Sequence, residues 1–165
     1  MTTNPRFVDR LEELPDRSVI ASMSGLAFLQ SIADGTLPGP PIARVLGYSL
    51  ESVEAGQVVF RATPLFDAMN PIGSIHGGWY GTLLDSCMSC AVQSRLPKGS
   101  GYTTLEYKVS LLRPMVPDGT EVRAIGTTIH VGRRTGTAEG RIVGVNDGKT
   151  YATGTATCLV MDIGS

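Results

Sequence analysis

The segment MNPIGSIHGGWYGTLLDSCMSCAVQS, residues Met69–Ser94, contains one carboxylate, Asp85, and no lysine or arginine. Its apolar residues recur at mixed spacings of three and four, with small residues between them, which predicts a helix over Gly77–Ser94 that is enclosed on most sides. A carboxylate buried in such a helix is costly unless it is hydrogen-bonded, neutralised or used in chemistry. Asp85 is therefore a candidate functional residue, although a structural hydrogen bond to a neighbouring loop would also explain it.

The sequence His76-Gly77-Gly78 stands where this helix should begin. Glycines at a helix start present backbone N–H groups with no Cβ beside them, and such groups suit an anionic or polarised oxygen. The two glycines could instead serve only tight packing. We expect His76 to position this end of the helix through a hydrogen bond to the backbone, because a helix-start histidine does this at least as often as it transfers protons.

Other elements surround the predicted central helix. We expect a helix over Ser22–Ala33, an extended proline and glycine linker over Thr36–Ala43, and a hairpin of two strands, Val45–Val53 and Gln57–Thr63. Four strand-like runs follow the central helix, separated by turn-forming residues: Thr103–Leu112, Glu121–Val131, Thr135–Asn146 and Thr150–Met161.

The last run alternates small residues with larger ones. Ala152, Gly154, Ala156 and Cys158 share one face, which would let a helix lie close against the sheet. The order of elements predicts an α+β hotdog fold, in which a curved antiparallel sheet wraps around one long helix, because parallel βαβ winding would need more crossover helices. We expect an amino-terminal arm over residues 1–20 and one hotdog domain over 21–165, with an extra helix near its start.

The composition is typical of one soluble domain. The chain has 165 residues, 42% of them hydrophobic, and a formal net charge of −1, which gives no electrostatic case for nucleic acid or an anionic membrane. No apolar run is long enough to span a bilayer, and the amino terminus is charged where a signal peptide would be apolar. We therefore expect a cytoplasmic protein.

The three cysteines suggest neither a disulfide framework nor a metal site. Cys87, Cys90 and Cys158 are odd in number, in keeping with a reducing compartment. The CxxC of Cys87 and Cys90 has no second CxxC or histidine pair to complete a zinc site, and a redox dithiol normally has a βαβ context. Core packing is the preferred interpretation, and no metal is expected.

The motif NPIGSIHGGWYGTLLDS closely resembles the helix-start motif of the PaaI-like hotdog acyl-CoA thioesterases. Four further segments resemble successive parts of the same family, so the resemblance covers nearly everything after the first helix: LPGPPIARVLGY, TTLEYKVSLLRP, VGRRTGTAEGRIV and GKTYATGTATCLV. The resemblance implies hydrolysis of an acyl-CoA or aryl-CoA thioester to the free acid and CoA, with no metal or organic cofactor.

The resemblance also implies roles for particular residues. It assigns the catalytic acid to Asp85 and the N–H that polarises the thioester carbonyl to Gly77. The asparagine before the helix, which would orient the acid, corresponds to Asn70. Thr104 corresponds to the hydroxyl residue that helps to place water, although that position is often serine in the family. Ordinary explanations exist for two of these residues, since Asn70 could cap a turn and Thr104 fits strand propensity.

Spacing along the helix predicts a dimer. Gly77 and Asp85 are eight residues apart, so a helix separates them by roughly 12 Å. Both must come within about 3 Å of one reacting group, and a side chain that leans toward the helix start recovers only part of that gap. We therefore expect Gly77 of one subunit to face Asp85 of a neighbour across a two-fold axis. The family resemblance implies that such homodimers pair into tetramers.

Substrate contacts are predicted at both ends of the ligand. His76, Gly78 and Trp79 are predicted to contact the substrate, and Trp79 could line an acyl pocket or belong to the core. Arg133 and Arg134, in a turn between two strands, are candidates to bind the CoA phosphates, because guanidinium groups match phosphate geometry. A solvated hairpin tip explains them equally well, and Arg113 and Lys98 are weaker candidates.

Two other functions remain open at this point. A hotdog dehydratase or hydratase would act on similar thioesters, but would pair a histidine with an acid at a different spacing. A non-catalytic acyl-CoA binding protein would usually carry an effector domain, and the segment Met1–Arg17 is too short for a DNA-binding module.

Overall fold

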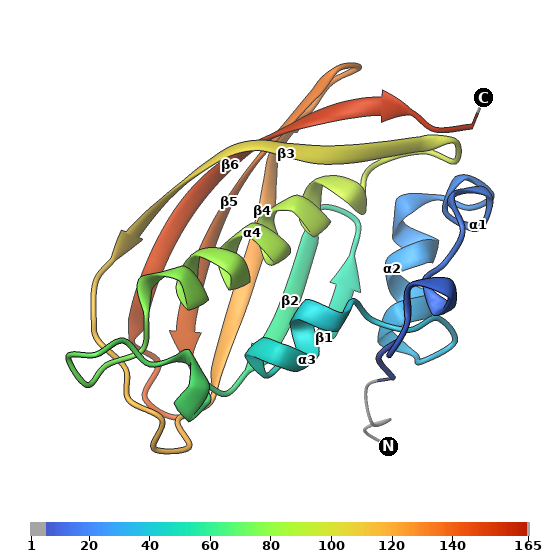
Figure 1. Cartoon of the computed structure of the whole chain (residues 1–165). Coiled ribbons are helices and arrows are strands. Elements are labelled where there is room, and N and C mark those ends of the chain that lie inside the picture. The colour runs from blue at the N-terminus through green and yellow to red at the C-terminus, as the bar shows by residue number, and fades with distance from the viewer. Residues whose placement is uncertain (1–5, 165) are drawn as a thin grey trace.

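A six-stranded antiparallel sheet curves around one long helix in the computed structural model, which describes residues 6–164 (Figure 1). The strand order is β1-β2-β4-β5-β6-β3, and every neighbouring pair is antiparallel. The fold is the predicted hotdog fold. The strands are β1 (Tyr48–Glu54), β2 (Gln57–Ala62), β3 (Ser100–Leu111), β4 (Val122–Val131), β5 (Thr135–Gly144) and β6 (Thr150–Asp162).

The central helix α4 spans Gly77–Gln93, within one residue of its predicted end. His76 caps it, and the Nδ1 atom of His76 accepts a hydrogen bond from the N–H of Gly78 at 2.9 Å. Leu83, Leu84 and other apolar side chains of α4 are fully buried against the sheet. The helix is thus enclosed on most sides, as its small and apolar residues indicate.

The helix lies very close to the sheet where glycines face it. A Cβ added to Gly126 of β4 would stand 2.1 Å from the carbonyl oxygen of Cys87. On β6, Ala152, Ala156 and Cys158 are buried, which confirms the face predicted from their alternation. Small residues on the strands therefore set the distance between the two layers.

The segment before the first hairpin differs from the prediction. The linker expected over Thr36–Ala43 runs into a short helix, α3 (Pro41–Leu46), and β1 begins at Tyr48 rather than Val45. Pro41 at the first helical position is pre-organised for a helix start, and Gly47 ends the helix with φ of 70°. The end of the predicted linker and the first two residues of the predicted strand, Val45 and Leu46, therefore belong to a six-residue helix.

Three further helical segments precede α3. They are η1 (Leu11–Glu13), α1 (Arg17–Ala21) and α2 (Gly25–Ala33). Ser24 caps α2 through its hydroxyl group, which accepts a bond from the N–H of Ala27, so this helix begins later than the predicted Ser22. Residues 1–5 of the predicted arm lie outside the described residues, but Val8 of that arm is buried.

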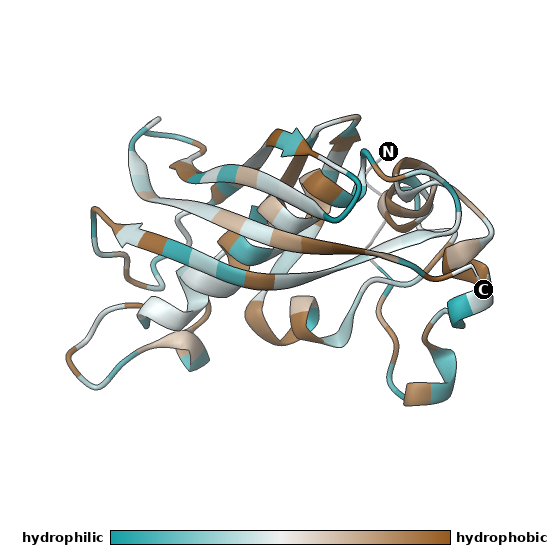
Figure 2. Ribbon diagram, turned by 90° about the horizontal axis from the view of Figure 1, so that it is seen from above, coloured by the Kyte–Doolittle hydropathy of each residue, from teal (hydrophilic) through white to brown (hydrophobic). Residues whose placement is uncertain are grey.

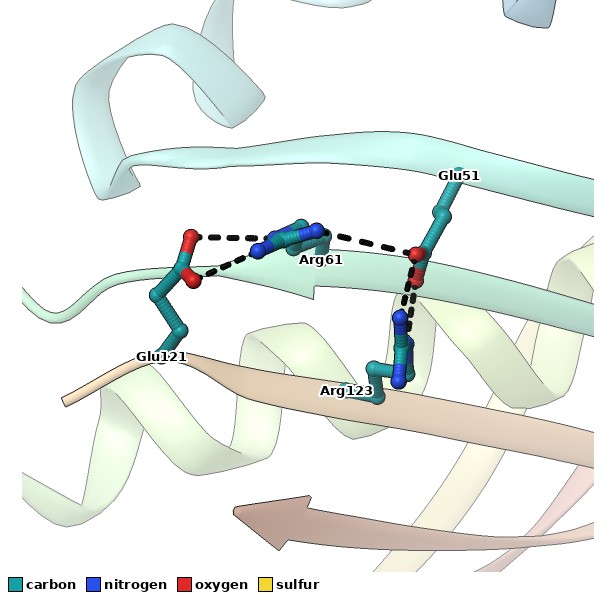
Figure 3. A network of polar contacts seen from close by, with 4 residues as sticks. All are labelled: Glu51, Arg61, Glu121 and Arg123. Carbon is teal, nitrogen blue, oxygen red and sulfur yellow. Dashed lines mark hydrogen bonds and ion pairs between the residues drawn. The ribbon is translucent and has the colours of Figure 1, made fainter. Parts of the chain in front are cut away.

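Ion pairs cross the face of the sheet that points away from α4 (Figure 3). Arg61 makes two hydrogen bonds with Glu121, and Arg123 makes two with Glu51 at 2.7 and 2.8 Å. The register of β1 and β2 shifts between Leu50 and Ser52, which places Glu51 at a bulge within reach of Arg61 and Arg123. These contacts link three strands, although exposed pairs of this kind contribute little to stability individually.

Figure 2 shows how hydrophobic and hydrophilic residues are distributed over the sheet and the helices. Hydrophobic and hydrophilic residues alternate along the strands, as expected for a sheet with one face against a helix and one face in water. Within residues 6–164, each helix is too short or too polar to cross a membrane.

We expect Gly126→Ala to lower the free energy of unfolding by about 2–3 kcal/mol, because the new methyl group would collide with the backbone of α4 rather than with a flexible side chain. Urea unfolding measures the change. Thr127→Ala, at the next position of the same strand, is the control and should change stability by no more than about 0.5 kcal/mol. Equal stability of the two variants would mean that the layers do not approach as closely as described.

Candidate active site

Asp85 lies in the middle of α4, half-buried, and is hydrogen-bonded to the neighbouring strand β3. The hydroxyl group of Thr104 donates to Oδ1 of Asp85 at 2.9 Å. The pairing of β3 with β6 shifts between Thr104 and Glu106, so Leu105 forms a bulge directly after Thr104. The second carboxylate oxygen of Asp85 receives no hydrogen bond from the described residues. It is therefore available to another group.

Burial raises the pKa of Asp85, and the hydrogen bond from Thr104 opposes part of this rise. The direction of this pKa shift matters because a carboxylate with a raised pKa accepts a proton more readily than a carboxylate with an ordinary pKa. A carboxylate whose pKa is raised by burial and that lies in a cleft is a candidate functional group.

A cleft of about 760 Å³ opens beside Asp85. The polar side of α4 forms one wall, and the amino-terminal helices and the hairpin form the opposite, apolar wall, with Phe28, Ile32 and Leu50 among its residues. Among the described residues that line it, Asp85 is the one carboxylate. The size and the mixture of apolar walls with few polar groups are typical of small-molecule sites.

Hydroxyl groups continue along the cleft from Asp85. Tyr48 and Ser86 lie 3.0 Å apart through their hydroxyl oxygens, and the hydroxyl of Tyr102 donates to that of Ser89 at 3.2 Å. These four residues were not predicted to be functional. Sequence alone offers a signal for Ser89, because the fourth position after Asp85 shares a face of the helix with it, and Ser86 lies three positions before Ser89. No sequence signal identifies the two tyrosines, which reach the cleft from distant strands.

The start of α4 is arranged as predicted. The N–H of Gly78 is satisfied by His76, and the N–H of Trp79 donates to the carbonyl oxygen of His76 at 3.0 Å. The N–H of Gly77 has no hydrogen-bond acceptor among residues 6–164. His76 is exposed and acts here as a cap, which agrees with its predicted positioning role.

Asn70 builds the turn that precedes α4. Its Oδ1 accepts a bond from the N–H of Ile72 at 3.0 Å, and its Nδ2 donates to the hydroxyl of Ser74 at 3.0 Å. No hydrogen bond joins Asn70 to Asp85 within the described protomer. The contact of Asn70 with the acid that the family resemblance implies would have to form between subunits.

Trp79 belongs to the core in this protomer. Its side chain is 3% exposed, and its indole N–H donates to the carbonyl oxygen of Leu46 at 2.9 Å, at the end of α3. Its ring also packs edge-on against Tyr80. The core alternative therefore describes Trp79 in this protomer, where the indole group does not line the cleft of Asp85, and its contact with the acyl group stays a prediction.

Arg133 and Arg134 are exposed in the turn between β4 and β5. The carbonyl oxygen of Arg134 accepts a bond from the N–H of Val160, which places this turn beside the end of β6. Neither arginine lines the cleft of Asp85. Their predicted contact with CoA phosphates stays a prediction.

The cysteines do not form a reactive or metal-binding group. Burial raises the pKa of the Cys90 thiol to about 12 and raises that of Cys87 further, so both stay protonated near neutral pH. No cluster of three histidine, cysteine or acidic side chains suitable for a metal ion occurs between Arg6 and Gly164. These findings agree with the core role predicted for the CxxC sequence.

The edge of the sheet beside the first half of α4 is open. β3 is an edge strand (Figure 1), and its Tyr107 and Leu111 are 47% and 53% exposed. Both side chains lie next to glycines of α4, because a Cβ on Gly81 would be 3.5 Å from Tyr107 and one on Gly77 would be 3.2 Å from Leu111. An uncovered edge strand beside exposed apolar side chains is typical of a surface that pairs with another chain.

This chain is similar to a known protein family, to a relative and to solved structures. The sequence profile of the Thioesterase superfamily matches residues 72–151, which include Gly77, Asp85 and Thr104. A protein of Halobacterium salinarum, provisionally named an esterase, is 33% identical over 96 residues that cover 52% of this chain and 62% of the relative. The match therefore spans less than two thirds of that relative.

Two solved structures have the same fold. A Ralstonia eutropha protein, provisionally assigned as a thioesterase related to phenylacetic acid degradation, is 30% identical with a TM-score of 0.71, and the match covers 80% of this chain and 98% of that one. A variant of the phenylacetic acid degradation protein PaaI of Thermus thermophilus is 27% identical with a TM-score of 0.65, covering 72% of this chain and 97% of that one.

We expect Asp85→Asn to raise the thermal unfolding midpoint at neutral pH. Burial raises the pKa of Asp85 from its ordinary value of 3.8, so the folded protein binds this proton more tightly than the unfolded chain does. Stability is therefore lost as the pH rises through the raised pKa. Asparagine carries no charge and avoids this loss.

The control is Asp118→Asn, because a hydrogen bond from Thr120 lowers the pKa of this exposed carboxyl. This variant should show no gain at pH 7.5. The gain for Asp85→Asn should shrink as the pH falls toward 4, and a gain that is equal at both pH values would contradict the assignment.

Proposed function

Because this chain belongs to the thioesterase superfamily, we propose that it hydrolyses acyl-CoA or aryl-CoA thioesters to the free acid and CoA, in active sites that two copies of the chain share. The observation that carries this proposal is the pair of groups on α4: a half-buried carboxylate with a raised pKa at Asp85 and a free N–H at Gly77. Thioester hydrolysis needs one group to activate water and another to stabilise the oxyanion.

Asp85 acts on water as the general base. Its proton affinity is raised by burial, and Thr104 holds one of its oxygens, so the other oxygen faces the water. The water oxygen bonds to the carbonyl carbon while its proton passes to Asp85. The carbon–sulfur bond then breaks, and the proton goes to the departing thiolate.

Direct attack by Asp85 would give the same products through an anhydride. A single turnover in oxygen-18 water separates the two routes, because only the anhydride route places label in the carboxylate of Asp85.

Gly77 stabilises the oxyanion. Its N–H is unpaired and stands at the amino-terminal end of a 17-residue helix, where the helix dipole adds partial positive charge. Asn70 fixes the turn that leads to this end and so positions the donor. His76 holds the N–H of Gly78, which directs the following turn of backbone.

The proposal that two chains share each active site rests on the length of helix between Gly77 and Asp85. Gly77 and Asp85 lie on one continuous helix, so roughly 12 Å of helix axis separates them. The open edge of β3 supports a two-fold partner, since edge-to-edge pairing would cover Tyr107 and Leu111 and bring the partner's helix start toward Asp85. The pairing would give two equivalent sites per dimer. A further pairing of dimers into tetramers is part of the proposal.

We expect Gly77→Pro to lower kcat by about 10²–10³-fold, because proline removes the donor that the oxyanion needs. Proline is suited to the first position of a helix, and His76 already has the extended backbone, with ψ of 140°, that a residue before proline prefers. Gly77→Ala is the matched control. It adds similar bulk near Leu111 but keeps the N–H, and should retain most activity.

We expect Asp85→Asn to lose at least about 10³-fold in kcat across acetyl, medium-chain, long-chain and phenylacetyl CoA esters, measured by thiol release. Unchanged circular dichroism would show that the fold is intact. Turnover near that of the unaltered protein would contradict the role of Asp85 whatever the acyl group.

A further inference from the structure

The cleft beside Asp85 continues into a second groove that carries positive charge. This groove of about 650 Å³ lies between α1 and the loop after α4, and it shares Arg17 and Ile163 with the cleft. Of the lining residues between 6 and 164, Arg17 and Lys98 are charged and none carries a carboxylate. Among the described residues neither cation forms an ion pair, so both are free to bind an anion.

The backbone around this groove is held in place. The N–H of Gly99 donates to the carbonyl oxygen of Ala21 at the end of α1, and the N–H of Ile163 donates to that of Gly99 at 2.8 Å. These two bonds tie α1, the loop and the end of β6 together. The nearby carboxylates of Asp16 and Asp162 accept bonds from the backbone N–H groups of Ser18 and Gly164.

An unpartnered amide lies between Asp85 and the basic groove. Gln93, in the last turn of α4, is 8% exposed and lines the cleft. Its side-chain amide forms no hydrogen bond with the described residues, in contrast to the neighbouring hydroxyls of Ser86 and Ser89, and its polar atoms reach the space of the cleft, because every fully buried side-chain polar atom of the described residues has a partner. An amide that opens onto a cleft from a largely buried residue is suited to an amide-containing ligand.

Asp85, Gln93 and the two cations follow one another in the same order as the thioester, the amides and the phosphates of an acyl-CoA. Eight residues of helix place Gln93 roughly 12 Å from Asp85 along the axis. The pantetheine arm, from its sulfur to the diphosphate, has about as many backbone bonds as four extended residues, or about 14 Å. The second amide of the arm lies seven bonds from the sulfur, or about 8 Å. A thioester at Asp85 would thus bring this amide within reach of the side chain of Gln93, which leans toward the start of α4, and would bring the phosphates near Arg17 and Lys98.

We propose, on the basis of the function proposed above, that the pantetheine arm lies along the second half of α4, with Gln93 bonded to an arm amide and with Arg17 and Lys98 bound to the CoA phosphates. The acyl group would then extend from Asp85 away from this groove. This assignment places the phosphates at α1 and the loop after α4 rather than at Arg133 and Arg134.

A series of three thioesters of one acyl group tests the proposal: the CoA ester, the pantetheine ester and the N-acetylcysteamine ester. N-acetylcysteamine carries only the first amide, pantetheine carries both amides, and CoA adds the phosphates. We expect Arg17→Ala and Lys98→Ala each to raise KM for the CoA ester by about tenfold, without changing kcat or the KM of the two shorter esters. Added salt should raise KM for the CoA ester less in these variants.

Gln93→Leu should raise KM for both the CoA and the pantetheine esters and spare the N-acetylcysteamine ester. Arg141→Ala is the control, because Arg141 is an exposed cation on the outer face of β5, and it should leave all three KM values unchanged. A rise in KM for the CoA ester with Arg133→Ala or Arg134→Ala, but not with Arg17→Ala and Lys98→Ala, would overturn the proposal.

The basic groove could instead hold a carboxylate at the far end of the acyl group. Esters of N-acetylcysteamine with a dicarboxylic acid distinguish an acyl carboxylate from the CoA phosphates, since a selective loss of their hydrolysis in Arg17→Ala would refute phosphate binding.

Calorimetry with free CoA tests the phosphate site without turnover. If the protein hydrolyses no thioester yet Arg17→Ala weakens CoA binding about tenfold, the hydrolysis proposed above fails and the phosphate site stands. Equal CoA affinity of Arg17→Ala, Lys98→Ala and the unaltered protein would refute the site.

Discussion

The rise of α4 along its axis is the constraint on which this account depends. An α-helix advances about 1.5 Å per residue, so the free N–H at Gly77 and the carboxylate of Asp85 cannot meet at one carbonyl group within a protomer. The fold makes this separation permanent, because α4 is held along its length by the surrounding sheet. Its glycine contacts, such as that of Gly126 with the backbone of Cys87, leave no room for a bend.

The same enclosure gives Asp85 its chemical character. The helix is buried by small and apolar side chains, and this burial raises the pKa of the one carboxylate among them. Thr104 satisfies one oxygen without neutralising the charge. In the function proposed above, this buried carboxylate is the base, and the exposed apolar residues of β3 leave the neighbouring edge open for a partner that would complete the site.

Most of the fold could be predicted from the sequence because its periodicities are strong. The alternation in β6 and the mixed spacing of α4 identified both layers, and the charge-free run around Asp85 selected this carboxylate as a candidate functional residue. α3 was missed because its proline-rich start resembled an extended linker and its last two residues, Val45 and Leu46, resembled the start of a strand. The sequence left Trp79 open between the core and an acyl pocket, because its partner, the carbonyl oxygen of Leu46, lies on that unpredicted helix. Tyr48 and Tyr102 have no local signal, since tertiary packing alone brings them to the cleft.

Subunit mixing tests the shared site most directly. Asp85→Asn and Gly77→Pro chains, each inactive alone, would be unfolded together in equal amounts and refolded. Half of the resulting dimers would contain one chain of each kind. Each of these mixed dimers would have one site with both defects and one site with an intact Asp85 and an intact Gly77 N–H. We expect about one quarter of the activity of the unaltered protein treated in the same way. Activity no greater than that of the two parents, with mixed dimers demonstrated by differently tagged chains, would contradict the account.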